Sequence, residues 1–351
     1  MEMNIDYPIG VLVNGNSRMN RLQPITPEGV SAQLKMDAKV IVTKRVEEVR
    51  GALEELLSCG CKLLAVAGGD GTIHIILTEL INLLGEYATF PRVLILRGGT
   101  MNIAASNLGT RRPPLMELRA LSIALELKRK KQLEIPVRRT RPLKLETPGL
   151  SRPLYGFLFA TGIAARILQE YYKGEPSPLR AVNVTTTVLL ESFVNRKSEN
   201  RFFKPVKSKI VLDGELYPSK DFKIAVATPL PRLLLWFSVF DESRGPLDRG
   251  FYFLANSMKT SAIAKNLWAL SRGKYSGPGQ VKGIFNKAEF ESVDLFTVDG
   301  ELYGKEGEGN KLTITSGPTM EFLDLSGIKL GRTLQDNFHY SLPSTGWIRT
   351  P

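Results

Sequence analysis

The chain has 351 residues, of which 43% are hydrophobic and 23% charged, a composition typical of a globular protein with one large or two medium domains. Lysine and arginine outnumber aspartate and glutamate by 47 to 35, and the resulting net charge of +12 favours polyanions such as nucleotides, nucleic acid or an anionic lipid surface. The sequence shows neither a membrane helix nor a secretory signal, and its two cysteines and two histidines lack the ligand pattern of a zinc site, so we expect a soluble protein of a reducing compartment.

The first third of the sequence alternates between strand and helix patterns. Short apolar runs that end in turn residues predict strands at Ile9–Gly15, Lys39–Lys44, Lys62–Gly69 and Arg92–Gly99. Apolar residues at helical spacing predict helices at Arg45–Gly60 (with Val46 on its apolar face), Thr72–Gly85 and Leu115–Lys131. Nearly all-apolar strands between amphipathic helices indicate a parallel sheet that is covered by helices on both faces.

The pattern changes after Ile135, where short alternating or apolar segments separated by turns predict an antiparallel β-sandwich or barrel. One helical stretch interrupts it, at about Pro178–Asn195. We therefore expect an α/β domain over residues 1–134, a β-sandwich domain over 135–330, and a tail at 331–351 that packs back on the first domain. The similar runs "VLDGELY" and "TVDGELYG" are interpreted as two Asp-Gly hairpin turns.

The densest basic cluster is Lys128–Lys144, "KRKKQLEIPVRRTRPLK", which holds a single acidic residue, Glu134. It has two interpretations. It is either a solvated helix end followed by a polar strand face, or a surface that meets phosphate groups.

A glycine-rich turn interrupts the apolar run Leu63–Leu77, "LLAVAGGDGTIHIIL". Such a strand-to-helix turn lies where α/β sheets bind ligands, and its backbone N–H groups and the helix dipole suit phosphate. Asp70 would repel a bare phosphate, so it indicates a metal-associated phosphate or a proton acceptor, and we expect it on an exposed turn. The alternative is a tight loop in which Asp70 or Thr72 only caps the helix.

Two further strand ends carry similar residues. Gly98 and Gly99 close the fourth predicted strand and are followed by Thr100 and Asn102. The first strand ends in "NGNSR", where Asn14 begins a run of hydrogen-bonding groups suited to a base or ribose. Since parallel strands end at one edge of a sheet, the three turns predict a single nucleotide cleft.

These motifs resemble those of the diacylglycerol kinase catalytic family, which includes bacterial lipid kinases and sphingosine and ceramide kinases. Gly68–Thr72 match its GGDGT signature, and Gly98–Asn102 match its second turn, with Met101 in place of a glycine. Asn14 and Thr43 stand where the family contacts the nucleotide, and "TVDGELYG" matches its C-terminal DGE motif. The family fold is an α/β domain followed by a β-sandwich, with the active site in the cleft between them.

The sequence also departs from the family pattern. His74 and Ile75 stand where many members have Asn-Glu, and Ile103 follows Asn102 where an aspartate is frequent. The stretch "LPRLLLWFSVFDESRGPLD", with Asp241 and Asp248, follows the family's structural metal loop only loosely.

The resemblance implies an ATP- and Mg²⁺-dependent lipid kinase that phosphorylates the hydroxyl of a lipid such as diacylglycerol. It implies catalytic roles for Asp70 and Glu301, and metal binding by Asp299 and Glu301. The residues implied to contact the nucleotide are Asn14, Thr43, Gly68, Gly69, Gly71, Thr72, Gly98, Gly99, Thr100 and Asn102. We expect a cytoplasmic enzyme that works peripherally on an anionic membrane surface, does not bind nucleic acid, and is compatible with a homodimer.

Two alternatives stay open at this point. An NAD kinase shares the GGDGT turn and a similar two-domain plan, although no convincing downstream Asn-Glu motif is found in the second domain. The other alternative is a regulatory protein of the same fold that binds nucleotide and has lost efficient catalysis, which the isoleucine at position 75 and the altered metal loop would favour.

Overall fold

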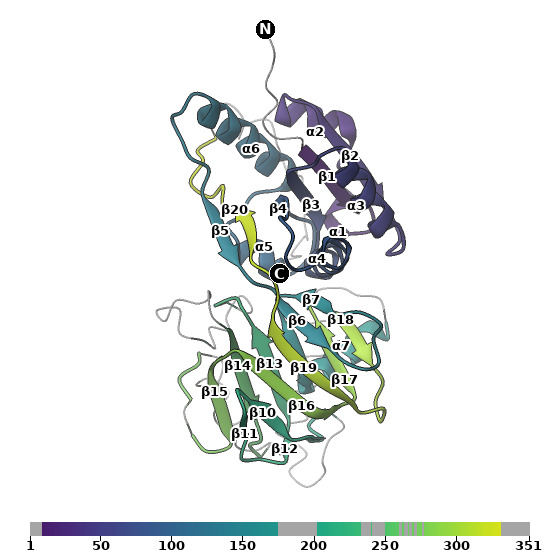
Figure 1. Cartoon of the computed structure of the whole chain (residues 1–351), viewed down its shortest axis with the longest axis vertical. Helices are drawn as coiled ribbons and strands as arrows, with labels where there is room; N and C mark the ends of the chain where they lie inside the picture. The colour runs from purple at the N-terminus through teal and green to yellow at the C-terminus, as the bar shows by residue number, and fades with distance from the viewer. Residues whose placement is uncertain are drawn as a thin grey trace, which may run out of the picture.

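The computed structural model describes residues 9–174, 202–232, 240, 250–259, 262, 266, 269, 272–275 and 277–330. Within them the chain builds a helix-covered sheet and, below it in Figure 1, a second body of antiparallel sheets. Three sequence predictions lie outside the described residues: the helix at 178–195, the two carboxylates Asp241 and Asp248, and the tail at 331–351. The same holds for residues 233–239 of the stretch "LPRLLLWFSVFDESRGPLD".

The sheet of the first body has the strand order β2-β1-β3-β4-β20-β5. Its first four strands are parallel, β20 continues parallel to β4, and β5 closes the edge antiparallel to β20. The bounds are β1 (Ile9–Asn14), β2 (Ala38–Thr43), β3 (Leu63–Gly68), β4 (Arg92–Arg97), β5 (Val137–Thr140) and β20 (Met320–Leu323). The predicted parallel sheet is therefore confirmed for β1 to β4 and β20, whereas the edge strand β5 runs antiparallel.

Helices cover both faces of this sheet, as the sequence predicts. They are α1 (Arg18–Leu22), α2 (Pro27–Leu34), α3 (Glu48–Ser58), α4 (Asp70–Leu84), α5 (Ile103–Asn107) and α6 (Pro114–Arg129). Successive strand residues point to opposite faces, so Leu12 packs into a core with α3 and α4, whereas Val11 packs into a core with α2 and α6.

Two helix starts differ from the expected ones by more than one residue. Val46 lies before α3 and is 54% exposed, because the Glu48 carboxylate accepts hydrogen bonds from the N–H groups of Lys44 and Arg45 and the helix begins only there. Helix α4 begins at Asp70 and not at Thr72, so Asp70 lies in the first helical turn.

The C-terminal end of the described chain returns to the first sheet, where β20, in yellow, lies beside β5 (Figure 1). The sheet thus extends past the boundary expected after residue 134. Met320 and Phe322 on β20 are buried, and Phe322 pairs with Val93 of β4. Burial of these apolar side chains in the first core stabilises the strand there.

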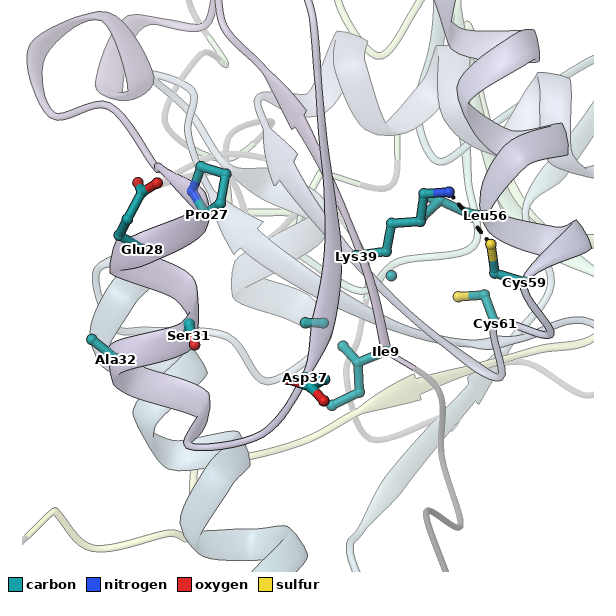
Figure 2. Close-up of a pocket in the computed structure, with 12 residues that line it drawn as sticks. Ile9, Pro27, Glu28, Ser31, Ala32, Asp37, Lys39, Leu56, Cys59 and Cys61 are labelled. Carbon is teal, nitrogen blue, oxygen red and sulfur yellow. Dashed lines mark hydrogen bonds between the residues drawn. The ribbon is translucent and has the colours of Figure 1, made fainter.

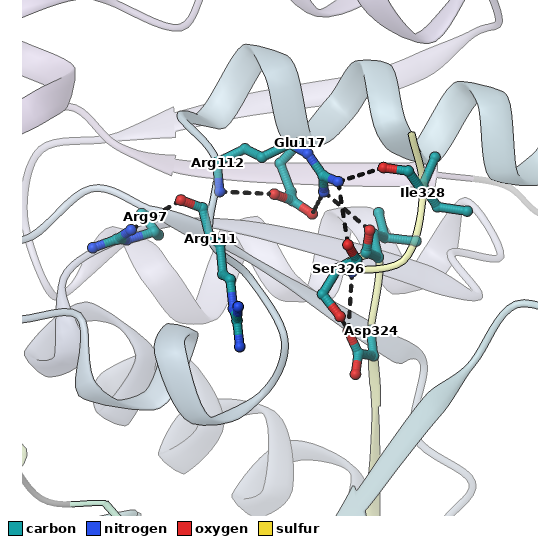
Figure 3. A network of polar contacts seen from close by, with 8 residues as sticks. Arg97, Arg111, Arg112, Glu117, Asp324, Ser326 and Ile328 are labelled. Atoms are coloured by element: carbon teal, nitrogen blue, oxygen red, sulfur yellow. Dashed lines mark hydrogen bonds and ion pairs between the residues drawn. The ribbon is translucent and has the colours of Figure 1, made fainter. Parts of the chain in front are cut away.

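Arg112 holds the segment that follows β20 (Figure 3). Its guanidinium donates hydrogen bonds to the carbonyl oxygens of Leu325, at 3.0 Å, and of Ser326 and Ile328, and it pairs with the fully buried Glu117 of α6 at 3.3 Å. This network fixes the end of the described chain against the first body.

In its described residues, the second body has two antiparallel sheets and a short strand pair. One sheet, in the order β11-β10-β16-β19-β6-β7, consists of β6 (Leu143–Glu146), β7 (Leu154–Gly156), β10 (Ile210–Leu212), β11 (Glu215–Leu216), β16 (Lys287–Val293) and β19 (Asn310–Ser316). The other, in the order β15-β14-β13-β8-β17-β18, consists of β8 (Phe159–Gly162), β13 (Ile224–Thr228), β14 (Phe251–Asn256), β15 (Gln280–Phe285), β17 (Leu295–Val298) and β18 (Glu301–Gly304). The pair consists of β9 (Val206–Lys207) and β12 (Asp221–Phe222).

Both large sheets contribute to one core, which contains Phe159 and Phe253 from one sheet and Phe290 from the other. A shared core between two antiparallel sheets is the arrangement of a β-sandwich, and this part of the predicted fold class is confirmed. Helix α7 (Ile163–Tyr172) follows β8 and was not among the predicted elements.

Candidate active site

The two glycine-rich turns lie in direct backbone contact at the carboxyl ends of β3 and β4. The N–H of Gly98 donates to the carbonyl oxygen of Gly68 at 2.8 Å. A Cβ atom on Gly99 would lie 2.5 Å from the Cα of Gly69, closer than any side chain can approach. The glycines are thus required by the close approach of the two turns, which the sequence predicts to share one cleft.

The end of β1 joins the same edge. The Asn14 side-chain amide donates to the Thr72 hydroxyl at 2.8 Å, which ties β1 to the first turn of α4. Thr43, at the end of β2, is buried, and its hydroxyl points back to the Val13 carbonyl oxygen at 3.4 Å. The predicted nucleotide-contacting residues of β1, β2 and the first glycine turn therefore lie at one end of the sheet.

Asn102 closes the second glycine turn on itself. Its backbone is left-handed, with φ of 51°, and its side chain both accepts from the Gly99 N–H at 3.0 Å and donates to the Gly99 carbonyl oxygen at 2.8 Å. Thr100 and Met101, between them, are exposed. Asn102 thus shapes the loop from within, while Thr100 is left at the surface.

The expectation that Asp70 lies on an exposed turn is wrong. Only 9% of the residue is exposed, and one carboxylate oxygen accepts the N–H of Ala104 at 3.0 Å, at the start of α5. Burial raises the pKa of this carboxyl, although hydrogen bonds from the N–H groups of residues 102–104 oppose the rise. Asp70 therefore joins the two glycine turns and does not cap its own helix, whose N-cap is Gly69.

The β17–β18 hairpin brings Asp299 to this edge from the second body. Asp299 and Gly300 form its turn with φ of 50° and 91°, as tight Asp-Gly hairpins require. The Asp299 carboxylate is buried and accepts the N–H of Phe157 at 2.7 Å. Burial raises its pKa well above the usual range, and the nearby negative charges of Asp70 and Glu301 raise it further.

Glu301 lies against the first turn of α4. A Cβ atom on Gly71 would approach the Glu301 Oε1 atom to 2.2 Å, so the carboxylate occupies the space that a side chain at Gly71 would need. Burial raises the pKa of Glu301 as well. The structure therefore brings Asp70, Asp299 and Glu301 together across the boundary between the α/β body and the β-sandwich.

These three carboxylates suit a cation that arrives together with a phosphate ligand. None of the ion pairs among the described residues involves them, and the described part of the chain contains no preformed group of three or more metal ligands. Mg²⁺ is commonly held by one or two carboxylates, waters and substrate phosphates. The donor set fits a metal–nucleotide complex better than a metal held by protein side chains alone.

His74 is a site residue that the sequence pattern did not explain. It lies one turn after Asp70 on α4 and is 1% exposed, with Nδ1 2.7 Å from the Tyr155 carbonyl oxygen and Nε2 2.6 Å from the Tyr303 hydroxyl. Burial lowers its pKa to about 4, so the imidazole is neutral near neutral pH. The only sequence feature that could have pointed to this role of His74 is its partner Tyr303, which lies two residues after Glu301 in the run "TVDGELYG".

We expect this buried imidazole to make the free energy of unfolding depend on pH between 6.5 and about 4. The unfolded chain protonates His74 below 6.5 while the folded protein keeps it neutral, so stability falls as pH falls through this window. Urea unfolding at about pH 7 and pH 5 should show the stability advantage of wild type over His74→Asn shrinking by about 2 kcal/mol. An advantage that stays constant would mean that His74 titrates normally when folded.

A pocket of about 890 Å³ lies elsewhere, at the amino-terminal ends of β1 and β2 (Figure 2). Ile9, Asp37 and Cys61 are among its lining residues, and Lys39 reaches the Cys59 Sγ atom at 3.4 Å across it. No residue of the glycine turns lines it. This pocket is therefore at the opposite end of these strands from the carboxylates.

Comparison with known proteins confirms the resemblance drawn from the motifs. Residues 8–133 match the family model of the diacylglycerol kinase catalytic domain. A candidate diacylglycerol kinase of Bacillus anthracis str. Sterne has a solved structure with a TM-score of 0.60 and 14% identity, covering 90% of this chain and 96% of that one. A diacylglycerol kinase of the same organism gives 0.59 and 13%, with the same coverage. At these identities the likeness concerns the fold.

A weaker structural match is the yeast NADH kinase in complex with NADH, with a TM-score of 0.47 and 10% identity over 98% of this chain and 90% of that one. A sequence comparison with curated proteins found no match. Among the described residues, no helix has the length and apolar character needed to cross a bilayer.

Proposed function

We propose that this chain, whose residues 8–133 match a diacylglycerol kinase catalytic domain, transfers the γ-phosphoryl group of ATP to the hydroxyl of a lipid such as diacylglycerol. The observation that carries the proposal is the position of Glu301, whose carboxylate lies against Gly71 in the glycine-rich turn. A hairpin of a separate β-sandwich has no structural need to place an acidic side chain there. Phosphoryl transfer does need such groups, because it depends on positioning and on neutralising charge.

The residues divide into two roles in this proposal. Asp70 is the proton acceptor for the lipid hydroxyl: as the hydroxyl oxygen bonds to the γ-phosphorus and the bond to ADP breaks, the proton passes to the Asp70 carboxylate. A raised pKa brings a carboxylate closer to the operating pH, where a general base is most effective. Asp299 and Glu301 would hold Mg²⁺ together with the nucleotide, and the ion when bound supplies positive charge to the phosphates.

The direct test is phosphorylation of a lipid panel in mixed micelles with Mg·ATP, with NAD as a parallel acceptor. We expect a phosphorylated lipid and no NADP. Turnover on NAD alone, or ATP binding without turnover on any acceptor, would overturn the proposal. The panel includes diacylglycerol, sphingosine and ceramide, so that the acceptor class is identified in the same experiment.

We further propose that the enzyme meets its lipid at an anionic cytoplasmic membrane surface through the end of α6. The second half of the basic cluster is bound within the molecule, where Arg138 and Arg139 pair with Asp324 and Glu321. At the end of α6, Lys128 pairs with the exposed Glu134 at 3.7 Å and Lys130 with the exposed Glu126 at 2.7 Å, and Arg129 is exposed.

Replacing Lys128, Arg129, Lys130 and Lys131 with glutamine is expected to weaken binding to vesicles that contain an anionic lipid. Each basic residue near such a surface contributes about 1 kcal/mol. Sedimentation with vesicles of mixed anionic and neutral lipid measures the loss, and vesicles of neutral lipid alone are the control. Activity on a short-chain lipid in solution should stay unchanged. Equal vesicle binding by wild type and variant would show that these four residues are only a solvated helix end and do not contact the membrane.

A further inference from the structure

The imidazole of His74 joins the helix of the glycine-rich turn to both sheets of the β-sandwich. Its two partners lie on β7 and β18, and each of these is the edge strand of a different sheet. His74 and Tyr303 are 229 positions apart in the sequence. One buried side chain on α4 is thus bonded to two separate sheets of the second body.

The chemistry of the partners fixes the tautomer. A backbone carbonyl oxygen only accepts hydrogen bonds, so Nδ1 carries the proton that is donated to Tyr155. In the neutral imidazole Nε2 is then an acceptor, and the Tyr303 hydroxyl must donate to it. Each group therefore has a single role, and neither partner can be exchanged without leaving a buried polar atom unpaired.

His74 and the Asp299 carboxylate meet at one backbone position, Gly156. A Cβ atom there would lie 3.1 Å from His74 Nδ1 and 2.5 Å from an Asp299 carboxylate oxygen. Phe157, two residues after Tyr155, donates its N–H to the same Asp299 oxygen. The segment whose Tyr155 carbonyl oxygen is bonded to His74 is thus the same segment whose Phe157 N–H is bonded to Asp299.

The second hydrogen bond of His74, between Nε2 and the Tyr303 hydroxyl, acts on β18, the strand that begins with Glu301. Tyr303 lies two residues after Glu301 on β18, and its ring stacks on Phe296 with the centroids 5.6 Å apart. The His74 ring meets Tyr303 edge-on, at 5.7 Å and 84°. The bond to Nε2 therefore restrains the strand that carries Glu301 toward Gly71.

We propose that His74 is a positioning residue, which holds the Asp299–Gly300–Glu301 turn in register with the glycine-rich turn of α4. The kinetic part of this proposal rests on the proposed kinase function, whereas its structural part does not. Side chains that orient metal-binding carboxylates from behind commonly change activity about 10–100-fold when they are removed. We expect the same range here.

His74→Asn and Tyr303→Phe are the test variants. The asparagine keeps an N–H donor for the Tyr155 carbonyl at the δ position and loses the acceptor for Tyr303, and the phenylalanine removes the same bond from the other side. Thr78→Val is the matched control, because Thr78 lies one turn further along α4 and bonds the N–H and the carbonyl of Tyr155 without touching Tyr303. Loss of the Thr78 hydroxyl should lower the melting temperature while the turnover number changes little.

In the kinetic assay we expect both test variants to lower kcat at least tenfold while KM for the lipid stays within about twofold. The double variant should lose no more than either single one, because both remove one bond. Two outcomes would overturn the proposal. One is that Thr78→Val loses as much kcat as His74→Asn with a similar fall in melting temperature, which would show that His74 only contributes to stability. The other is an unchanged kcat in both test variants.

Two measurements do not depend on kinase activity. The sequence has only two histidines, so nitrogen-15 spectra of wild type and His339→Gln assign the His74 signals directly. We expect the Nδ1-protonated tautomer, and faster hydrogen exchange at the Phe157 amide by at least tenfold in both test variants. If wild type phosphorylates no acceptor but these results hold, the proposed function fails and the positioning role stands; the other tautomer or unchanged exchange refutes the positioning role by itself.

Discussion

Asp70→Asn is expected to lower the turnover number for lipid phosphorylation by about 10²–10⁴-fold, the usual cost of losing a positioned acid–base group. The amide has the shape of the carboxylate but cannot accept the proton of the lipid hydroxyl. Because Asp70 is buried and accepts the Ala104 N–H, the variant also places an amide against backbone donors. Melting temperature and circular dichroism are therefore measured beside the rate.

The matched control is Asp213→Asn, in the β10–β11 hairpin. Asp213 is exposed, and its carboxylate accepts the N–H groups of Asn286 and Lys287 at 2.9 Å and 2.7 Å, so it also loses backbone hydrogen bonds on substitution. It lies in the sandwich, away from the glycine turns. A fall in melting temperature with a normal rate is expected. A near-normal rate in Asp70→Asn itself would refute the assignment of Asp70 as the proton acceptor.

Glu301→Gln is expected to weaken Mg·ATP binding by about 10–100-fold and to lower the phosphorylation rate, with little change in the melting temperature without ATP. Interactions that involve a charged group are worth about 1.5–3 kcal/mol, and the glutamine removes the charge while keeping the shape. Isothermal titration with Mg·ATP gives the affinity. Unchanged affinity in a folded variant would place Glu301 outside the nucleotide site.

Gly71→Ala tests the same contact from the opposite side. The added Cβ atom would lie 2.2 Å from the Glu301 Oε1 atom, which is the far end of a side chain, so we expect the carboxylate to be displaced while the helix stays intact. Gly51→Ala is its control, since Gly51 lies in α3 and, apart from its own helix backbone, nothing lies within 4 Å of the added methyl group. The first variant should reproduce the loss of Glu301→Gln, and the second should keep full activity.

The sequence by itself determined seven elements of the first body, the strands β1 to β4 and the helices α3, α4 and α6, but not α1, α2, α5, β5 or β20. Apolar runs such as Leu63–Gly68 and helical spacing such as that of α3 are local patterns, which a strand or helix must show to bury one side. The glycine turns could also be placed, because the carboxyl ends of parallel strands share one edge of the sheet. The family motif further predicted that the hairpin of Asp299 returns to that edge.

Only the tertiary structure decided how the carboxylates and their supports are held. The Asp70 carboxylate accepts hydrogen bonds from the N–H groups that begin α5, a five-residue helix without a marked pattern in the sequence. The partners of His74 lie on β7 and β18, and β20 enters a sheet whose other strands precede it by at least 180 positions. Hydrogen bonds between such distant residues leave no periodic pattern in the sequence, because they depend on where two edge strands come to rest against a helix.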